Sequence, residues 1–182
     1  MIPFFKHSLI KNKNYIKKTL ASSYLTSGPV CEKAERLLKI KFKKKYAILT
    51  NSWTNGLITI LLSLKLKPDD EIIIPACTFV ACANVIEMVG AKVVFADIDP
   101  STKLMDITDC IKKITKKTKV IMPVHLYGNL FQTKNLKKKI RKNIIIIEDS
   151  AHAFCGEYHN NTIGKYSDFL VFSFYATKSI TC

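Results

Sequence analysis

The sequence predicts an α/β fold in which helices cover both faces of a largely parallel sheet, giving three layers. Two observations indicate this fold. Segments with helical periodicity alternate with short β-branched runs, and the longest apolar runs, residues 144–147 and 169–172, have the length of strands. With 182 residues, 48% of them hydrophobic, the chain is long enough to bury one sizeable core.

The expected elements follow the alternating order that βαβ units require. Helices are expected at residues 9–21, 30–41, 54–65, 79–89, 107–114 and 135–141. Strands are expected at residues 46–50, 71–74, 92–96, 120–124, 144–148 and 168–173. Gly90 is placed to end the fourth helix, and Asp106 to cap the fifth. A loop at residues 25–29 makes residues 1–26 an N-terminal arm and helix, ahead of a main domain at residues 27–182.

The composition argues against membrane, metal and disulfide-stabilised proteins. No apolar run approaches the roughly 20 residues of a membrane-spanning helix. The N-terminal residues 1–7 have too short an apolar core for a secretory signal, so a cytoplasmic location is expected. The six cysteines form no CxxC pair and the four histidines no HExxH motif, which indicates buried free thiols and no metal site.

The formal net charge of +15 raises the alternative of a basic nucleic-acid-binding module. The lysines are, however, spread over helical segments, without a nucleic-acid-binding motif and without interleaved stacking aromatics. Solvated helix faces explain this pattern more simply, so neither a nucleic acid nor a membrane is expected as a partner.

Polar residues follow two of the expected strands, at the sheet edge where such folds bind ligands. Ser52, Trp53 and Thr54 follow the first strand in a turn that leads into a helix. Backbone N–H groups and the helix dipole there favour a phosphate, although the same residue types also cap helices. Asp149 follows the isoleucine run at 144–147, so its carboxylate is expected to be partly buried and to need a partner. That partner would be a salt bridge, a helix N-terminus or the protonated ring nitrogen of a cofactor.

Lys178 lies just past the sixth strand, five residues after Ser173. A desolvated lysine is the usual nucleophile toward an aldehyde cofactor. A phosphate-binding turn, a buried aspartate and a strand-end lysine are together the parts that hold pyridoxal 5′-phosphate. Motifs for a dinucleotide, GxGxxG, or for a nucleoside triphosphate, GxxxxGK[ST], do not occur.

Eight segments resemble, in order and spacing, the motifs of the DegT/DnrJ/StrS-type sugar aminotransferases, a branch of the fold-type I pyridoxal phosphate enzymes. They are residues 2–5, 25–29, 51–57, 74–81, 97–100, 123–128, 148–153 and 172–178. The resemblance implies the three-layer large domain of these enzymes and pyridoxal 5′-phosphate as cofactor. It also implies transfer of an amino group, usually from glutamate, to a keto-sugar carried on a nucleotide, in amino-sugar and surface polysaccharide biosynthesis. Related sugar dehydratases carry histidine at the position of Lys178, so lysine favours amino transfer.

The resemblance implies roles for the residues around the cofactor ring. Lys178 would be the Schiff-base lysine and the proton shuttle, and Asp149 would pair with the pyridine nitrogen. His152 falls beside the phenolic oxygen of the cofactor. Phe79 falls where an aromatic ring stacks on the pyridine.

The resemblance also implies a phosphate site and a substrate loop. Thr54, the neighbouring amides of its turn and Ser173 would hold the phosphate. Trp53 replaces a small residue that is common in this turn of the family. Gly28 and Pro29 fall in a loop that the family uses near the substrate.

Family members continue after the lysine with a Gly-Glu-Gly-Gly-like stretch, a further strand and a second domain, whereas four residues follow Lys178 here. The large domain is therefore expected to be truncated and the C-terminal small domain absent. Unpaired strand edges would make such a fragment fold poorly alone. A homodimer is expected for the full-length enzyme, and an inactive truncated fragment is the alternative.

Overall fold

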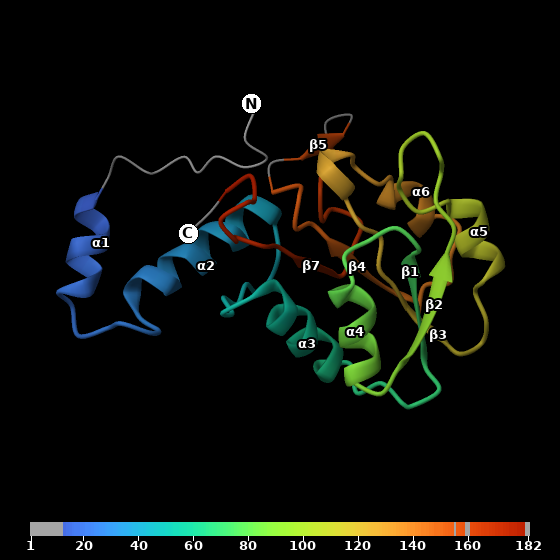
Figure 1. Ribbon diagram of the computed structural model, residues 1–182, viewed down its shortest axis with the longest axis horizontal. Helices are drawn as coiled ribbons and strands as arrows, with labels where there is room; N and C mark the ends of the chain where they lie inside the picture. Colours follow the sequence, from blue (N-terminus) through green and yellow to red (C-terminus); the bar gives the residue numbers. More distant parts are fainter. Residues whose placement is uncertain (1–12, 155, 159–160, 181–182) are drawn as a thin grey trace, which may run out of the picture. The chain divides into compact units, whose positions relative to one another are not determined.

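The structure is a computed structural model that describes residues 13–154, 156–158 and 161–180 (Figure 1). Two compact units are present, one up to Leu49 and one from Thr50 onward. The predicted division into an arm at residues 1–26 and a domain at residues 27–182 stays a prediction.

The first unit contains two helices, α1 at Lys13–Leu20 and α2 at Pro29–Phe42. Pro29 suits the start of α2 because its φ is already helical and its missing N–H would have had no partner within the helix. The helix expected at residues 9–21 is present as α1, and its first part lies outside the described residues. The helix expected at residues 30–41 is confirmed.

The strand expected at residues 46–50 is wrong. These residues have no regular structure, and Tyr46 and Ile48 are each 70% exposed. A strand needs a neighbour for its backbone N–H and C=O groups, and no strand in the described part of the chain pairs with this segment. The N–H of Leu49 donates instead to a Glu35 carboxylate oxygen at 2.9 Å. A β-prone run is therefore not sufficient for a strand here.

The second unit contains a parallel sheet, as predicted, with the strand order β2-β1-β3-β4-β7. Its strands are β1 (Glu71–Pro75), β2 (Lys92–Ala96), β3 (Thr118–Ile121), β4 (Ile145–Asp149) and β7 (Phe169–Val171). Its helices are α3 (Trp53–Ser63), α4 (Ala81–Met88), α5 (Ile107–Lys112) and α6 (Thr133–Lys137), with a 3₁₀ turn η1 (Leu126–Gly128). A small antiparallel pair, β5 (Glu157–Tyr158) and β6 (Asn161–Thr162), lies between β4 and β7 in the sequence.

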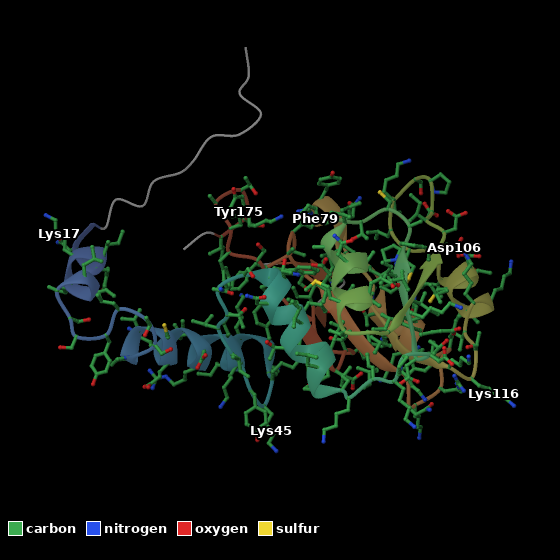
Figure 2. All side chains as sticks on the ribbon, turned by 60° about the horizontal axis from the view of Figure 1, so that its bottom comes forward. Lys17, Lys45, Phe79, Asp106, Lys116 and Tyr175 are labelled. Carbon is green, nitrogen blue, oxygen red and sulfur yellow. The ribbon has the colours of Figure 1, made fainter. Side chains whose placement is uncertain are left out.

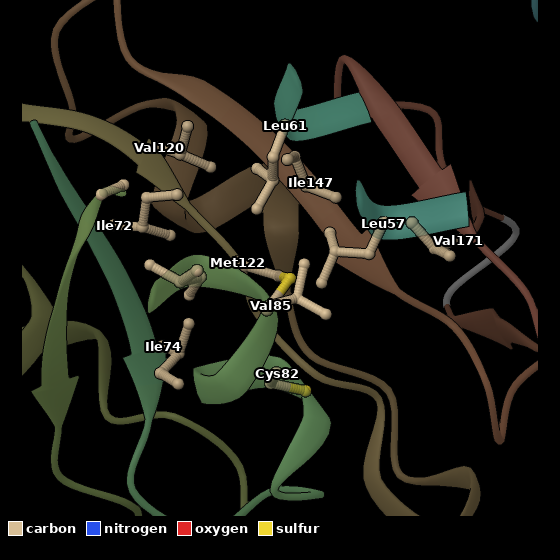
Figure 3. Packing of buried hydrophobic residues seen from close by; sticks show 12 residues of the cluster. Leu57, Leu61, Ile72, Ile74, Cys82, Val85, Val120, Met122, Ile147 and Val171 are labelled. Carbon is tan, nitrogen blue, oxygen red and sulfur yellow. The ribbon is translucent and has the colours of Figure 1, made fainter. Parts of the chain in front are cut away.

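Alternate residues of β1, β2, β3 and β4 enter two separate hydrophobic cores. Ile72 and Ile74 of β1 belong to the core that α3 and α4 cover, to which Leu57 and Leu61 of α3 also belong (Figure 3). Ile73, between them, enters the opposite core, which α5 and α6 cover. A parallel sheet buried on both faces needs continuous apolar runs, which explains the isoleucines at residues 72–74 and 144–147. The three-layer prediction is confirmed.

Local signals in the sequence correctly mark two helix ends. Oδ1 of Asp106 accepts the backbone N–H groups of Thr108 and Asp109, at 2.6 and 3.1 Å, and so caps α5. Gly90 follows α4 with φ of 80°, a left-handed conformation that glycine adopts without steric cost. α4 therefore ends before β2 begins.

The described cysteines, at positions 31, 77, 82 and 110, are free thiols, but the prediction that they are buried holds only for Cys82 and Cys110. Cys31 is half-buried and Cys77 is exposed. Among the residues that the structure covers, no group of three metal-binding side chains occurs. No helix in the described part of the chain has the length and apolar character to cross a membrane.

Parallel pairing brings the carboxyl ends of all five strands to one edge of the sheet. Figure 2 shows Phe79 and Tyr175, which follow β1 and β7, projecting from the same side of the unit. Lys116, which precedes β3, lies at the opposite side. The predicted cofactor residues of this unit therefore converge on the edge where parallel sheets bind ligands.

Candidate functional site

Asp149 ends β4 as a buried carboxylate, 3% exposed. Its Oδ1 accepts two N–H groups, from the Trp53 indole and from the Ala151 backbone, each at 3.0 Å. Its Oδ2 faces the thiol of Cys82 at 3.5 Å. Burial raises the pKa of Asp149, and the hydrogen bonds from Ala151, Cys82 and Trp53 only partly oppose it. The predicted burial is confirmed, and no ion pair to Asp149 is found among the residues described here.

The turn before α3 places Trp53 against Asp149. Ser52 caps the helix by accepting the backbone N–H of Asn55 at 3.2 Å, and Trp53 is the first residue of α3. Gly56 brings this turn close to β7, because a Cβ built on it would lie 3.5 Å from Val171 Cγ1. The first backbone N–H groups of α3, including that of Thr54, have no partners within the helix and can bind an anion.

Lys178 and His152 are in direct contact, with 2.8 Å between Nζ and Nε2. His152 Nδ1 accepts the backbone N–H of Tyr127 at 3.3 Å, and the Tyr127 ring stacks on the imidazole at 5.5 Å. Burial lowers the pKa of His152 and the charge of Lys178 lowers it further, so the imidazole is neutral at pH 7. Because Nδ1 accepts the Tyr127 N–H, Nε2 is the ring nitrogen that faces Nζ of Lys178.

Tyr127 is in an unusual backbone conformation, with φ of 51° and ψ of 30°. Few residues other than glycine adopt this left-handed region, and such conformations cluster at functional sites. The conformation directs the Tyr127 N–H toward His152. Sequence analysis missed this residue, and its signal was the position directly before Gly128 in a loop that follows a strand.

The other predicted cofactor residues lie in the loop after β1, in the first turn of α3 and in the segment after β7. Phe79 is 69% exposed in the loop after β1. Thr54 is half-buried in the first turn of α3. Ser173 Oγ accepts the backbone N–H of Tyr175 at 3.3 Å and so orders the segment that leads to Lys178. Their predicted contacts with a cofactor stay predictions.

Gly28 and Pro29, predicted near the substrate, belong to the first unit. Gly28 precedes α2 and packs against Tyr24, since a Cβ built on it would lie 2.7 Å from Tyr24 Cβ. Pro29 is the first residue of α2. Both have local structural roles, and their contact with a substrate stays a prediction.

A second buried polar pair lies on the opposite face of the sheet. Glu148 Oε2 is 3.4 Å from His125 Nε2 and accepts the backbone N–H of Gly164 at 2.6 Å. His125 Nδ1 accepts the N–H of Phe131 at 3.0 Å. Because neighbouring strand residues point to opposite faces, Glu148 fixes loops on one side of β4 while Asp149 enters the site on the other. Sequence analysis did not single out this pair.

The free energy of unfolding is expected to decrease on acidification because of Glu148. Burial alone would raise its pKa, but the neighbouring His125 imidazole, the Thr133 hydroxyl and the hydrogen bond from the Gly164 N–H bring the pKa below its ordinary value. A depressed folded-state pKa gives stability that is present above the unfolded value of about 4.3 and is lost as the pH falls through the folded value. Urea unfolding of the chain at pH 7 and pH 3, compared with Glu148→Gln, measures the effect.

We expect Glu148→Gln to lose about 1–3 kcal/mol of unfolding free energy at pH 7, because the carboxylate hydrogen bonds are weakened. On acidification, the unfolding free energy of the variant should decrease less than that of the parent chain. Equal pH dependence in the two proteins would contradict this assignment.

The fold and the constellation of Asp149, Lys178 and the α3 turn define the large domain of a fold-type I pyridoxal phosphate-dependent transferase. The chain belongs to the DegT/DnrJ/EryC1/StrS aminotransferase family, whose model matches residues 9–182. The family expected from sequence motifs is confirmed.

Similar proteins include a curated enzyme and a solved aminotransferase structure. GDP-perosamine synthase of Escherichia coli O157:H7 is 36% identical over 183 residues, which cover 99% of this chain and 50% of the enzyme. The structure of Helicobacter pylori PseC, an aminotransferase involved in the biosynthesis of pseudoaminic acid, matches with a TM-score of 0.92 and 31% identity, covering 98% of this chain and 49% of PseC.

A further solved structure contains a bound cofactor. NtdA of Bacillus subtilis with bound cofactor PMP matches with a TM-score of 0.85 and 33% identity, covering 92% of this chain and 38% of NtdA. The chain spans about half the length of the curated relatives that it matches.

Proposed function

We propose that the protein is a pyridoxal phosphate-dependent aminotransferase that transfers an amino group from glutamate to a nucleotide-linked keto-sugar. The observation that carries the proposal is Asp149, a buried carboxylate with no ion-pair partner among the described residues, at the same sheet edge as Lys178. A protonated ring nitrogen would supply the missing cation, so the residues present fit the cofactor. PMP, bound in NtdA, is the amino form of the same cofactor.

The residues of the chain have distinct tasks in this proposal. When bound, pyridoxal phosphate supplies an electron sink that stabilises negative charge on the substrate carbon. Asp149 holds the ring nitrogen in its protonated form, and the N-terminus of α3 binds the phosphate. Lys178 binds the cofactor aldehyde and later moves a proton at its Nζ. His152, in contact with Nζ at 2.8 Å, holds the Lys178 amine in place.

The substrate class is proposed from the relatives. GDP-perosamine synthase is named for a nucleotide-linked amino sugar, and PseC for the biosynthesis of an amino-sugar acid. We propose a similar keto-sugar for this protein, in surface polysaccharide or lipopolysaccharide synthesis, by a cytoplasmic homodimer. Phe79, Ser173, Gly28 and Pro29 keep their predicted cofactor and substrate roles here.

Isotope transfer tests the function directly. The chain, loaded with pyridoxal phosphate, is incubated with ¹⁵N-labelled glutamate and with GDP-, UDP- or dTDP-linked 4-keto sugars. Mass spectrometry should find ¹⁵N in one sugar nucleotide, together with 2-oxoglutarate. A chain that binds the cofactor but labels no sugar with any of the three nucleotides would contradict the proposed substrate class.

An inactive fragment of such an enzyme is the second candidate. Its support is that β7 has β4 as its single neighbour among the described strands, which leaves one edge of β7 without a ladder partner. The same assay separates the two candidates, because a fragment without activity of its own would release no 2-oxoglutarate from glutamate.

A further inference from the structure

The two oxygens of the Asp149 carboxylate have unequal environments. Oδ1 accepts good N–H donors from Trp53 and Ala151, both at 3.0 Å. Among the described residues, Oδ2 has a single donor, the thiol of Cys82, at 3.5 Å. A thiol is a weak donor, so Oδ2 is the oxygen with hydrogen-bonding capacity left.

We propose that Trp53 is a positioning residue for Asp149. Its indole N–H, together with the Ala151 amide, holds Oδ1 and turns Oδ2 toward the ring nitrogen of the cofactor. This inference rests on the proposed cofactor and gives Trp53 a task apart from the backbone of the phosphate turn in which it lies.

The chemistry of the indole suits this task. Its Nε1–H can only donate, so it binds the carboxylate and cannot compete with it for the ring proton. Trp53 is also the first residue of α3, directly after the capping residue Ser52. One side chain thus connects the turn that would bind the phosphate with the acid that would bind the ring nitrogen at the other end of the cofactor.

Cys82 completes the environment of Oδ2 without competing for that position. Burial and the Asp149 charge raise the pKa of its thiol to about 12, so the sulfur stays protonated at neutral pH. Thr78 Oγ1 lies 3.2 Å from the same sulfur. A charged N–H⁺ donor makes a much stronger hydrogen bond to a carboxylate than a thiol does, so a cofactor ring would displace this contact.

The fluorescence of the chain tests the contact without any cofactor. Trp53 is the single tryptophan of the 182 residues, so its emission is assigned without further variants. We expect the emission of the cofactor-free chain to follow one titration step, the ionisation of Asp149, at a pH above the ordinary aspartate value of about 3.9. Asp149→Asn, verified as folded by circular dichroism, should lack the step. An unchanged step in this variant would overturn the contact.

A double-mutant cycle on pyridoxal phosphate affinity tests the positioning. Trp53→Phe keeps an aromatic ring and removes the N–H. We expect it to weaken binding of the cofactor about tenfold, as for one lost charge-assisted hydrogen bond. In the Asp149→Asn background, Trp53→Phe should weaken cofactor binding by less than about twofold, because the carboxylate that Trp53 positions is absent.

The possible results distinguish a failure of the positioning role of Trp53 from a failure of the proposed function. Equal losses in both backgrounds would mean that Trp53 supports only the phosphate turn, and an unchanged affinity of Trp53→Phe would also overturn the inference. Lys116→Ala, at the opposite side of the unit (Figure 2), is the control and should leave the affinity unchanged. If the parent chain binds no pyridoxal phosphate, the proposed function fails and the positioning role with it, while the fluorescence titration still decides whether Trp53 contacts Asp149.

Discussion

Replacing Lys178 by alanine is expected to abolish the visible absorbance band that the chain gains with pyridoxal phosphate. The band arises from attachment of the cofactor aldehyde to the lysine amine, and Lys178 is the amine held by His152 at 2.8 Å. Amino transfer should decrease by about 10⁴-fold, because nucleophile and base are lost together. Absorbance spectra and initial rates of 2-oxoglutarate formation measure both effects.

Two variants control this prediction. Lys178→Arg keeps a positive charge but offers no nucleophile at neutral pH, so it should also lack the band. Lys116→Ala removes a lysine at the opposite edge of the sheet (Figure 2) and should leave the spectrum unchanged. A band that persists in Lys178→Ala would show that another amine binds the cofactor.

Asp149→Asn is expected to decrease amino transfer by about 10³-fold, a cost typical of removing a preorganised electrostatic group from an active site. An amide cannot hold the ring nitrogen in its protonated form, so the cofactor loses most of its capacity to accept electrons. The kcat and KM for the sugar, measured at saturating pyridoxal phosphate, separate this effect from weaker cofactor binding. A variant with parental kcat would contradict the role of Asp149.

The same substitution is expected to stabilise the cofactor-free chain at pH 7. Burial raises the pKa of Asp149, so the stability linked to its protonated form is present at low pH and is lost as the pH rises through the folded-state pKa. Asparagine carries no charge, so the variant avoids the free-energy cost of a buried ionised carboxylate at pH 7. The Tm of Asp149→Asn should exceed that of the parent without cofactor, and the difference should shrink on acidification. A lower Tm at pH 7 would argue that the carboxylate is satisfied without a cofactor.

Features that depend on residues close in the sequence could be predicted. The isoleucine run before Asp149 indicates a buried strand and hence a buried carboxylate, and both are present. Asp106 and Gly90 mark helix ends by local backbone chemistry, so they too could be assigned from neighbouring residues.

Features that depend on distant partners could not be predicted. The hydrogen bond between Trp53 and Asp149 joins residues 96 positions apart, and the indole could equally have packed in a core. Residues 46–50 have the composition of a strand, but pairing is decided by whether a neighbour is present. Tyr127 acts through its backbone N–H, which no side-chain motif reveals.

The strand order has a consequence for the way the protein is made. In the five-stranded sheet, β2, β3, β4 and β7 each pair in parallel with a strand that has already been synthesised, and each parallel connection spans a long stretch of chain. Such high contact order slows folding and leaves strand edges open while synthesis proceeds. Asp149 can reach Trp53 only after β4 has left the ribosome, and Lys178 only joins them after β7. The fluorescence of Trp53 should therefore report the late assembly of the site. Stopped-flow refolding can follow it without an added label.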